Sequence, residues 1–171
     1  LGEEYKCIAS KGHLRELDSY KNYEITFKIA KDKFSHIEQM KKIMKHYEKE
    51  NIILATDDDR EGEAIGWHLC QIFGLSEKMT KRLRFNEISF PALQNAWKDK
   101  DIINMNLVKA QSTRQIIDRW IGFTFSPMVS KHVGKKGLSA GRCQTPTLRL
   151  IMDNIEKRKQ SSNETIYHVK A

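Results

Sequence analysis

The sequence predicts an α/β domain with a mainly parallel sheet, followed by a basic and mainly α-helical segment. In the first half, patterns typical of strands alternate with patterns typical of helices, whereas the second half shows helical spacing. The charge changes at the same place: residues 1–80 hold 13 Lys and Arg against 15 Asp and Glu, and residues 81–171 hold 17 against 7. We therefore expect two parts, residues 1–80 and residues 81–171.

The elements of the first part follow from hydrophobic periodicity. Apolar residues at alternate positions indicate a half-buried strand, and a continuous apolar run indicates a strand covered on both faces. Apolar residues three or four positions apart indicate helices, and Gly74 ends the second of them. In chain order we expect strands over 5–9, 23–29, 52–55 and 82–85, with helices over 34–47 and 61–73. This alternation implies parallel strands joined by right-handed crossovers.

The second part is predicted to be helical. Pro91 and Pro127 fall near the first turns of two candidate helices, where the missing N–H of proline is tolerated. We expect helices over 89–97, 107–121, 126–134 and 144–159, the third ended by Gly134. The excess of ten positive charges in this part favours a polyanionic partner, most commonly nucleic acid, although a lysine-rich solvated surface would give the same composition.

Composition excludes several classes of protein. Apolar residues make up 39% of the chain and charged residues 30%, which is typical of a folded domain rather than a disordered one. No apolar run approaches the roughly 20 residues that span a bilayer, and the first residues lack the features of a signal peptide. Three widely spaced cysteines provide neither a disulfide framework nor a zinc ribbon, so we expect a reducing, intracellular compartment.

An acidic segment directly after the buried strand over 52–55 is the most specific feature of the sequence. Five of the seven residues at 57–63 are acidic, and Asp57, Asp59 and Glu61 stand at alternate positions. Ligands of open α/β sheets bind at the carboxyl ends of strands. We expect the three carboxylates to converge there on a hard cation such as Mg²⁺, which would relieve their mutual repulsion.

Three other interpretations of this segment compete with a catalytic magnesium site. A calcium loop fits its first positions, but its twelfth position is His68 rather than Glu. A phosphatase of the Asp-x-Asp type would need a hydroxyl residue soon afterwards. Acidic residues that only cap the following helix would account for Asp59 or Glu61, but not for all five acids. A metal-binding catalytic cluster is the preferred interpretation.

Four segments resemble the type IA DNA topoisomerases, in the order in which that family carries them. The segment ATDDDREGEAIGWHL at residues 55–69 resembles the acidic motif of the family's Toprim domain. SKGHLREL at residues 10–17 resembles the segment near the start of that domain, and FNEIS at residues 85–89 resembles the junction that follows it. LSAGRCQTP at residues 138–146 resembles the Ser-Ala-Gly-Arg-x-Gln motif of the strand-binding domain.

The resemblance implies specific roles for these residues. Asp57, Asp59 and Glu61 would hold Mg²⁺ beside the scissile phosphate, and Arg142 would act with them at the cut. It also implies a Toprim-like fold and a partner in DNA, chiefly single-stranded, together with further domains of a parent enzyme. We expect no membrane partner, and a location in the cytoplasm and nucleoid or in the nucleus. The residues expected to contact DNA are His13, Arg60, Arg114, Gln115, Asp118, Arg119, Lys131, Ser139, Ala140, Gly141, Arg142, Cys143 and Gln144.

Several of these assignments have physical reasons or competing interpretations. Arg114 and Asp118 stand four residues apart on a predicted helix, so they share a face and are expected to pair. Arg60 would either steer DNA or pair with Asp58 or Glu63. Gly141 would allow close backbone approach to the strand.

Two parts of the family's machinery are not seen in the sequence. A catalytic Glu on an opening strand is missing, and no tyrosine stands in a nucleophile motif. We therefore interpret the chain as a fragment of a type IA topoisomerase that is inactive alone. The alternatives are a non-catalytic single-strand-binding module and another Toprim enzyme, a primase or nuclease. The subfamily (relaxing enzyme, decatenase or reverse gyrase) stays open.

Overall fold

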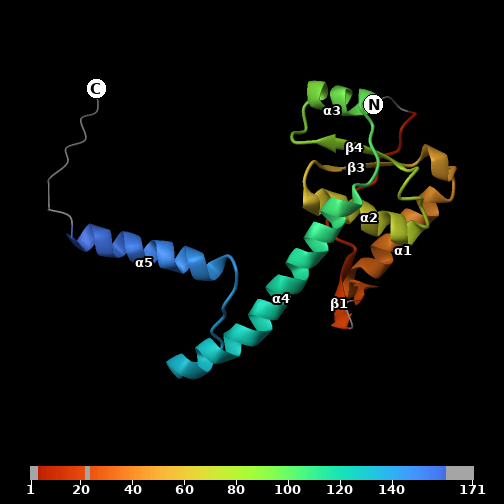
Figure 1. Cartoon of the computed structure of the whole chain (residues 1–171). Helices are drawn as coiled ribbons and strands as arrows, with labels where there is room; N and C mark the ends of the chain where they lie inside the picture. Colours follow the sequence, from red (N-terminus) through yellow and green to blue (C-terminus); the bar gives the residue numbers. More distant parts are fainter. Residues whose placement is uncertain (1–3, 22–23, 161–171) are drawn as a thin grey trace, which may run out of the picture. The chain divides into compact units, whose positions relative to one another are not determined.

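The structure is a computed structural model that describes residues 4–21 and 24–160 of the 171-residue chain. It divides into two compact units, residues 1–116 and residues 117–171. The first unit contains the strands and the shorter α-helices, together with the first part of α4 (Met105–Val133). The second unit contains the rest of α4 and α5 (Gln144–Gln160), as the colours of Figure 1 allow the reader to follow.

A pair of parallel strands forms the centre of the first unit. β3 (Ile53–Asp57) pairs with β4 (Lys81–Phe85), so that Asp57 lies opposite Phe85 at the carboxyl ends. The strands are joined by α2 (Arg60–Phe73), which ends where Gly74 adopts a left-handed conformation with φ 62°. The pair lies between α2 and α3 (Phe90–Lys98) in Figure 1. The predicted parallel strands and the predicted end of α2 are confirmed.

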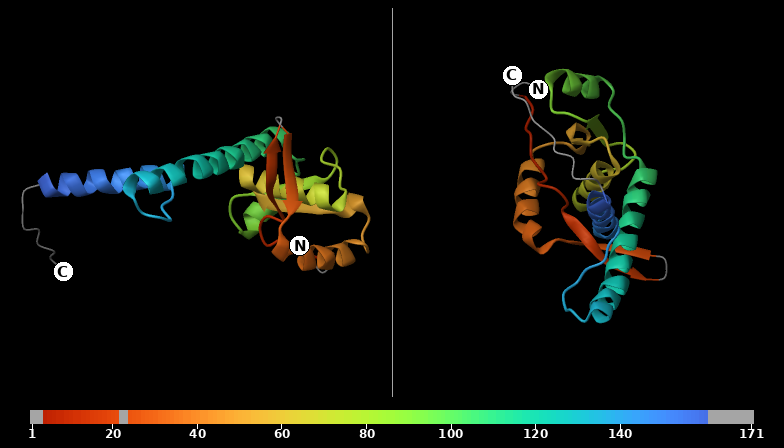
Figure 2. Two further views of the ribbon diagram at one scale, coloured as in Figure 1. Left: turned by 90° about the horizontal axis from the view of Figure 1, so that it is seen from below. Right: turned by 90° about the vertical axis from the view of Figure 1, so that its left-hand side faces the viewer.

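An antiparallel hairpin precedes this pair. β1 (Arg15–Lys21) pairs with β2 (Glu24–Ile29), and Figure 2 shows the two strands side by side. The strand predicted over 23–29 is therefore present, but its partner is antiparallel, so only β3 and β4 form the expected parallel sheet. The strand predicted over 5–9 is wrong, because these residues have no regular secondary structure; Tyr5 packs instead against the ring of Trp97.

The hydrophobic core of the first unit lies between α1 (Phe34–Met44), α2 and the start of α4. The buried apolar residues of this core come from α1, β3, α2, the start of α4 and the segments before β1, after α2 and before α4. They are Leu14, Ile37, Met40, Leu54, Leu69, Cys70, Leu75, Ile103 and Val108. Because Ile103 and Val108 belong to this core, the start of α4 is packed against the same residues that support β3.

The second unit consists of helix and loop within the described residues. The helices predicted over 107–121 and 126–134 are wrong as separate elements, since α4 continues through Pro127. Proline lacks a backbone N–H, so the helix has one hydrogen bond fewer at this point. α5 is present as predicted and has no buried residue, so Leu150 and Ile151 are exposed. Among the described helices, none is long and apolar enough to cross a membrane.

Candidate metal centre and nucleic-acid interface

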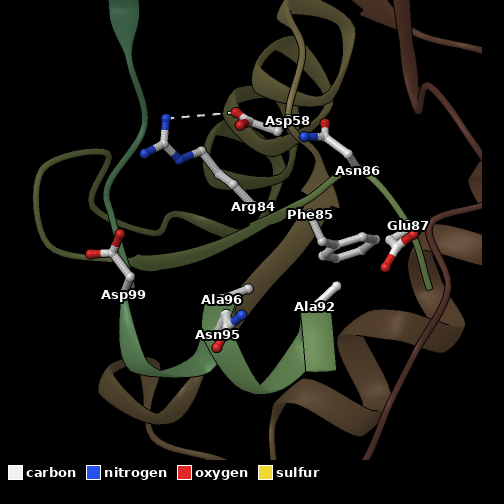
Figure 3. Close-up of a pocket in the computed structure, with 9 residues that line it drawn as sticks. All are labelled: Asp58, Arg84, Phe85, Asn86, Glu87, Ala92, Asn95, Ala96 and Asp99. Atoms are coloured by element: carbon white, nitrogen blue, oxygen red, sulfur yellow. Dashed lines mark ion pairs between the residues drawn. The ribbon is translucent and has the colours of Figure 1, made fainter. Parts of the chain in front are cut away.

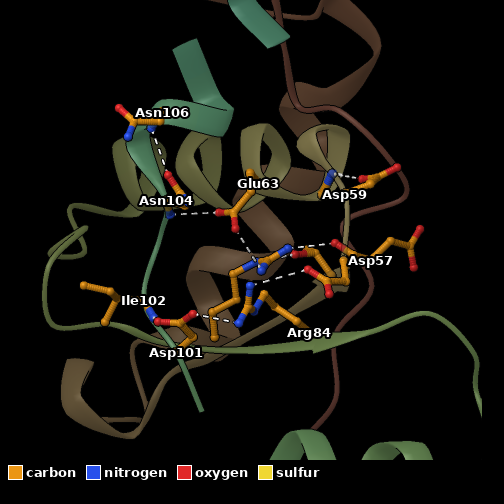
Figure 4. A network of polar contacts seen from close by, with 12 residues as sticks. Asp57, Asp59, Glu63, Arg84, Asp101, Ile102, Asn104 and Asn106 are labelled. Carbon is orange, nitrogen blue, oxygen red and sulfur yellow. Dashed lines mark hydrogen bonds and ion pairs between the residues drawn. The ribbon is translucent and has the colours of Figure 1, made fainter. Parts of the chain in front are cut away.

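The acidic segment forms the turn between β3 and α2. Asp57 is the last residue of β3, and Asp59 is the N-cap of α2, where its Oδ1 accepts a hydrogen bond of 2.7 Å from the Gly62 N–H. Aspartate is a favoured N-cap because its carboxylate satisfies a backbone donor that the helix leaves unpaired. Figure 4 shows Asp57 and Asp59 at this end of β3. The acids are therefore placed at the carboxyl end of a parallel strand, as predicted.

Gly62 allows the turn to be this tight. A Cβ atom built on Gly62 would overlap the carbonyl oxygen of Asp57, which belongs to the backbone and has no flexible end to move aside. Any other residue would push α2 away from the end of β3. The glycine of the acidic motif thus holds the start of α2 close to Asp57.

Glu61 is turned toward the segment that precedes β1. The Nε2–H of His13 donates to the Glu61 carboxylate, with 3.0 Å between Nε2 and Oε1. The other oxygen, Glu61 Oε2, is buried and has no hydrogen-bond partner among the described residues. The resemblance predicts that His13 contacts DNA; its observed contact is with a predicted metal ligand. Glu61 therefore keeps one carboxylate oxygen available for another ligand.

His68 packs behind His13 in a cluster of rings. Its ring lies 5.9 Å from that of His13 and 4.8 Å from that of Phe27, and Trp67 is 5.0 Å away. Burial, together with the smaller effects of the nearby charges of Arg15 and His13, lowers the pKa of His68 from 6.5 to about 3. His68 is therefore a neutral packing residue at neutral pH, and it supports the face of α2 that carries Glu61.

The three predicted metal ligands do not converge on one point in this structure. Among the described residues, no three Asp, Glu, His or Cys side chains form a group able to hold a metal ion. Asp57 and Asp59 are exposed at the end of β3, while Glu61 is engaged with His13. The arrangement offers two carboxylates to solvent and a third that is held to one side.

The charged residues between these acids have partners of their own. Asp58 pairs with Arg84 at 3.6 Å, and the buried Glu63 pairs with Arg82 at 3.1 Å. The two acids suggested as partners of Arg60 are thus paired with other arginines, and Arg60 is exposed at the first position of α2. The contacts of Arg82 were not foreseen, because its partners stand 19 or more residues away and the sequence shows only an arginine in a strand.

A pocket of about 390 Å³ adjoins the acidic segment at the end of β4. Figure 3 shows it between β4 and α3, with the Asp58–Arg84 ion pair at one edge. Three of its lining residues are acidic and one is basic, so it disfavours a phosphate group. The lining residues are Asp58, Arg84, Phe85, Asn86, Glu87, Ala92, Asn95, Ala96 and Asp99.

The predicted strand-binding motif of the second unit is built around Arg142. Its Nε donates to Asp118 Oδ1 at 2.8 Å, and one Nη donates to Asp118 Oδ2 at 3.4 Å. This carboxylate raises the pKa of Arg142 and holds the guanidinium in one orientation. The observed contact of Asp118 thus joins α4 to the motif. A guanidinium has five N–H donors, so the two hydrogen bonds to Asp118 do not use all the donors of Arg142.

The loop of the motif is fixed by hydrogen bonds to α4 and α5. The Ala140 N–H donates to Ser126 Oγ at 3.0 Å, and the Gly141 N–H donates to Thr145 Oγ1 at 3.2 Å. A Cβ on Gly141 would overlap the end of the Gln144 side chain, which is flexible and could move aside. Ser139, Cys143 and Gln144 are exposed beside Arg142.

The other predicted DNA contacts lie along α4. Arg114 and Gln115 are half-buried in the part that belongs to the first unit. Arg119 and Lys131 are exposed in the second unit, and the guanidinium of Arg119 lies 5.7 Å from the ring centre of Phe123. The structure thus brings Asp118 and Arg142 together, and it distributes the remaining basic residues along one long helix.

Comparison with known proteins identifies relatives of both halves of the chain. Residues 1–88 match the family described as Toprim domain, and residues 102–171 match the family described as DNA topoisomerase. The solved structure of full-length topoisomerase I from Thermotoga maritima is similar, with a TM-score of 0.73 and 34% sequence identity. The match covers 94% of this chain and 28% of that protein. The chain therefore belongs to the Toprim-containing DNA topoisomerases of type IA.

Proposed function

We propose that this chain provides the acidic Mg²⁺ site and part of the single-strand groove of a type IA DNA topoisomerase. The parent activity would be Mg²⁺-dependent transient cleavage and religation of one DNA strand through a phosphotyrosine. The observation that carries the proposal is the position of Asp57 and Asp59 at the carboxyl end of β3, beside the start of α2. Such an enzyme would act on chromosomal DNA inside the cell.

The residues of the acidic turn fit a magnesium ion. Asp57 and Asp59 present exposed carboxylates, and Glu61 Oε2 is a buried oxygen with no hydrogen-bond partner among the described residues. Mg²⁺ prefers oxygen ligands, keeps several waters and is commonly held by one or two carboxylates, so a convergent triad is not required. Asp57 and Asp59 would hold the ion, and Glu61, which is turned toward His13 here, would complete the site only after its carboxylate reorients. When bound, the ion would screen phosphate charge and help to place the 3′ end for religation.

The second unit supports the binding of a DNA strand. Arg142 is oriented by Asp118, and Arg119 and Lys131 are exposed on α4. Phosphate contacts of this kind fix a strand without reading its bases. The boundary that we propose at residue 80 follows the change in net charge along the sequence. It differs from the boundary between the two compact units, which falls after residue 116 because α4 begins in the core of the first unit.

Single-stranded DNA should bind to the chain in a salt-dependent way, and Arg142→Ala should weaken that binding. Each phosphate contact releases counterions, so the loss of one contact should lower the slope of log K against log salt by about 0.7. We expect affinity to fall by about one order of magnitude at low salt. Fluorescence anisotropy of a labelled oligonucleotide over a series of salt concentrations measures both quantities.

Arg149→Ala is the matched control for this experiment. Arg149 is an exposed arginine that pairs through its Nε with Asp153 at 2.9 Å, in the same unit. Its replacement removes the same charge from a similar ion pair and should change affinity far less. Equal losses of DNA affinity in the two variants would mean that only net charge matters. Arg142 would then not be a residue of the strand-binding groove.

The 171-residue polypeptide should form no covalent adduct with DNA. Cleavage needs a phenol placed at the scissile phosphate. Tyr5 packs on Trp97, Tyr20 lies within β1 and Tyr47 follows α1, so none of the three belongs to the acidic turn or to the Arg142 motif. Tyr23 and Tyr167 lie outside the described residues. Supercoiled plasmid incubated with Mg²⁺, then denatured and digested with protease, tests this; a protein-linked nick would contradict it.

A further inference from the structure

We propose that Arg82 and Glu63 are positioning residues of the acidic site: their buried ion pair fixes the end of β3, where Asp57 stands, to the start of α4. The inference rests on the proposed function, because Asp57 is one of the carboxylates assigned to Mg²⁺. Figure 4 shows the network of contacts around these residues. Every residue in it belongs to the first unit.

The pair is removed from solvent. The Arg82 side chain is 0% exposed and the Glu63 side chain is 1% exposed. Arg82 Nη1 lies 3.1 Å from Glu63 Oε1. These two atoms have no hydrogen bond to any described residue, so their mutual attraction is what offsets their burial. Burial lowers the pKa of Arg82, and the charge of Glu63 opposes this effect.

The remaining nitrogens of Arg82 hold the end of β3. Nε donates to Thr56 Oγ1 at 2.9 Å, and Nη2 donates to the backbone oxygen of Asp57 at 2.7 Å. The guanidinium is planar, and its N–H donors point in fixed directions. Contacts from three of its nitrogens therefore fix Thr56, Asp57 and Glu63 relative to one another. Arg82 therefore fixes the backbone from which the Asp57 carboxylate projects.

Glu63 and the backbone of Arg82 hold the start of α4. Glu63 Oε2 accepts from the Asn104 N–H at 3.1 Å, and Asn104 Oδ1 accepts from the Asn106 N–H at 3.0 Å at the first turn of α4. Arg82 also exchanges two backbone hydrogen bonds with Asp101, of 2.8 and 2.9 Å. One buried pair thus contacts both the acidic turn and the helix that carries the predicted DNA contacts.

Stability alone does not account for such a pair. Removing two charges from water is costly, and packed apolar residues of similar volume commonly give equal or greater stability. What an apolar pair cannot supply is directed contact with Thr56, Asp57 and Asn104 at the same time. A positioning role and a stabilising role therefore predict different outcomes for the same substitutions.

The deciding variant is Arg82→Met with Glu63→Met. It removes one positive and one negative charge, so the net field at the acidic turn changes little, and it keeps the volume of both side chains. We expect the variant to fold, with a Mg²⁺ affinity about tenfold weaker, as is common when an outer partner of a metal ligand is lost. NMR titration of the amides at 56–63 measures the affinity. Hydrogen exchange at 104–108 should become faster in the same variant.

The control pair is Lys41→Met with Glu38→Gln. Lys41 lies on α1 in the same unit and pairs with Glu38 at 2.8 Å, at an exposed site. This change is also neutral in charge, and within the described part of the chain neither side chain has a hydrogen bond or ion pair to the acidic turn or to the start of α4. Mg²⁺ affinity and exchange at 104–108 should stay close to those of the wild type.

Each outcome decides the inference. A folded double variant with unchanged Mg²⁺ affinity overturns it. If the double variant does not fold, Arg82→Lys carries the test, because it keeps the charge but offers a single nitrogen; a folded lysine variant should bind Mg²⁺ several-fold more weakly. Unchanged affinity, or failure to fold in this variant also, would make the pair a stability element only.

The outcome for the proposed function is separate. A wild-type chain that shows no response to Mg²⁺ contradicts the metal site, whatever the variants do. In that case hydrogen exchange alone decides the inference: the exchange of residues 56–58 and 104–108 must become faster together in the double variant or in Arg82→Lys, and independent behaviour of the two segments overturns it.

Discussion

Replacing Asp57 and Asp59 together by asparagine should abolish the response of the chain to Mg²⁺. The two carboxylates are exposed at the end of β3, and Glu61, held by His13, supplies too little charge to offset the dehydration of the cation. Asparagine is a good N-cap, so position 59 keeps its hydrogen bond to Gly62 and α2 stays intact. NMR titration with Mg²⁺, followed at the amides of residues 56–63, measures the response.

The control is Asp32→Asn with Glu38→Gln, which removes two negative charges from the surface of the same unit. Asp32 contacts Lys33 and Glu38 contacts Lys41, both in exposed ion pairs. This variant should respond to Mg²⁺ as the wild type does. Shifts confined to other acidic patches, or a full response in the Asp57 and Asp59 variant, would exclude the metal site proposed here.

Lowering the pH from 7 to 5 should destabilise the first unit through His68, by about 2 kcal/mol. An unfolded histidine takes up a proton near its ordinary pKa of 6.5, whereas burial holds the pKa of His68 at about 3 in the folded state. Between these values the unfolded state binds more protons, so the free energy of unfolding falls as the pH falls. Urea unfolding at the two pH values, followed by tryptophan fluorescence, measures the difference.

The variant His68→Phe isolates this effect. Phenylalanine keeps a ring among Phe27, Trp67 and His13, and no hydrogen bond to Nδ1 is lost, because that atom has no partner among the described residues. Its stability should depend less on pH between 7 and 5, while the exposed His46→Gln should retain the wild-type dependence. An identical pH dependence in His68→Phe and the wild type would show that His68 is not buried in its neutral form.

The sequence was sufficient for the parts of the fold that depend on local patterns. The apolar run at 52–55 and the stop at Gly74 identified β3 and α2, and the acidic segment located the turn between them. Strand β1 was missed because it reads Arg-Glu-Leu-Asp-Ser-Tyr-Lys, in which too few residues are apolar for alternation to show. Pro127 suggested a break in α4, but the helix continues through it.

The site was predicted by residue type but not by contact. Asp57, Asp59 and Glu61 were identified as a set, yet the direction of Glu61 depends on His13, which stands 48 residues away. The contact of Asp118 with Arg142, which comes from a loop 24 residues on, was not predicted, and the pairing of Asp118 with Arg114 expected from helical spacing stays a prediction. Such pairings depend on the packing of separate elements, for which a single sequence carries no periodic signal.

The contact between His13 and Glu61 has a consequence for the order of folding. Asp59 is placed by the first turn of α2, a contact between residues close in sequence, whereas Asp57 stands at the end of a parallel strand whose partner strand begins at residue 81. Glu61 is oriented only when the segment before β1 closes a long loop onto α2, and the entropy of loop closure must be overcome before that contact forms. A refolding chain should therefore place Asp59 early and Asp57 and Glu61 late, so we expect cation affinity to develop only after β3 has paired with β4 and the segment before β1 has closed onto α2.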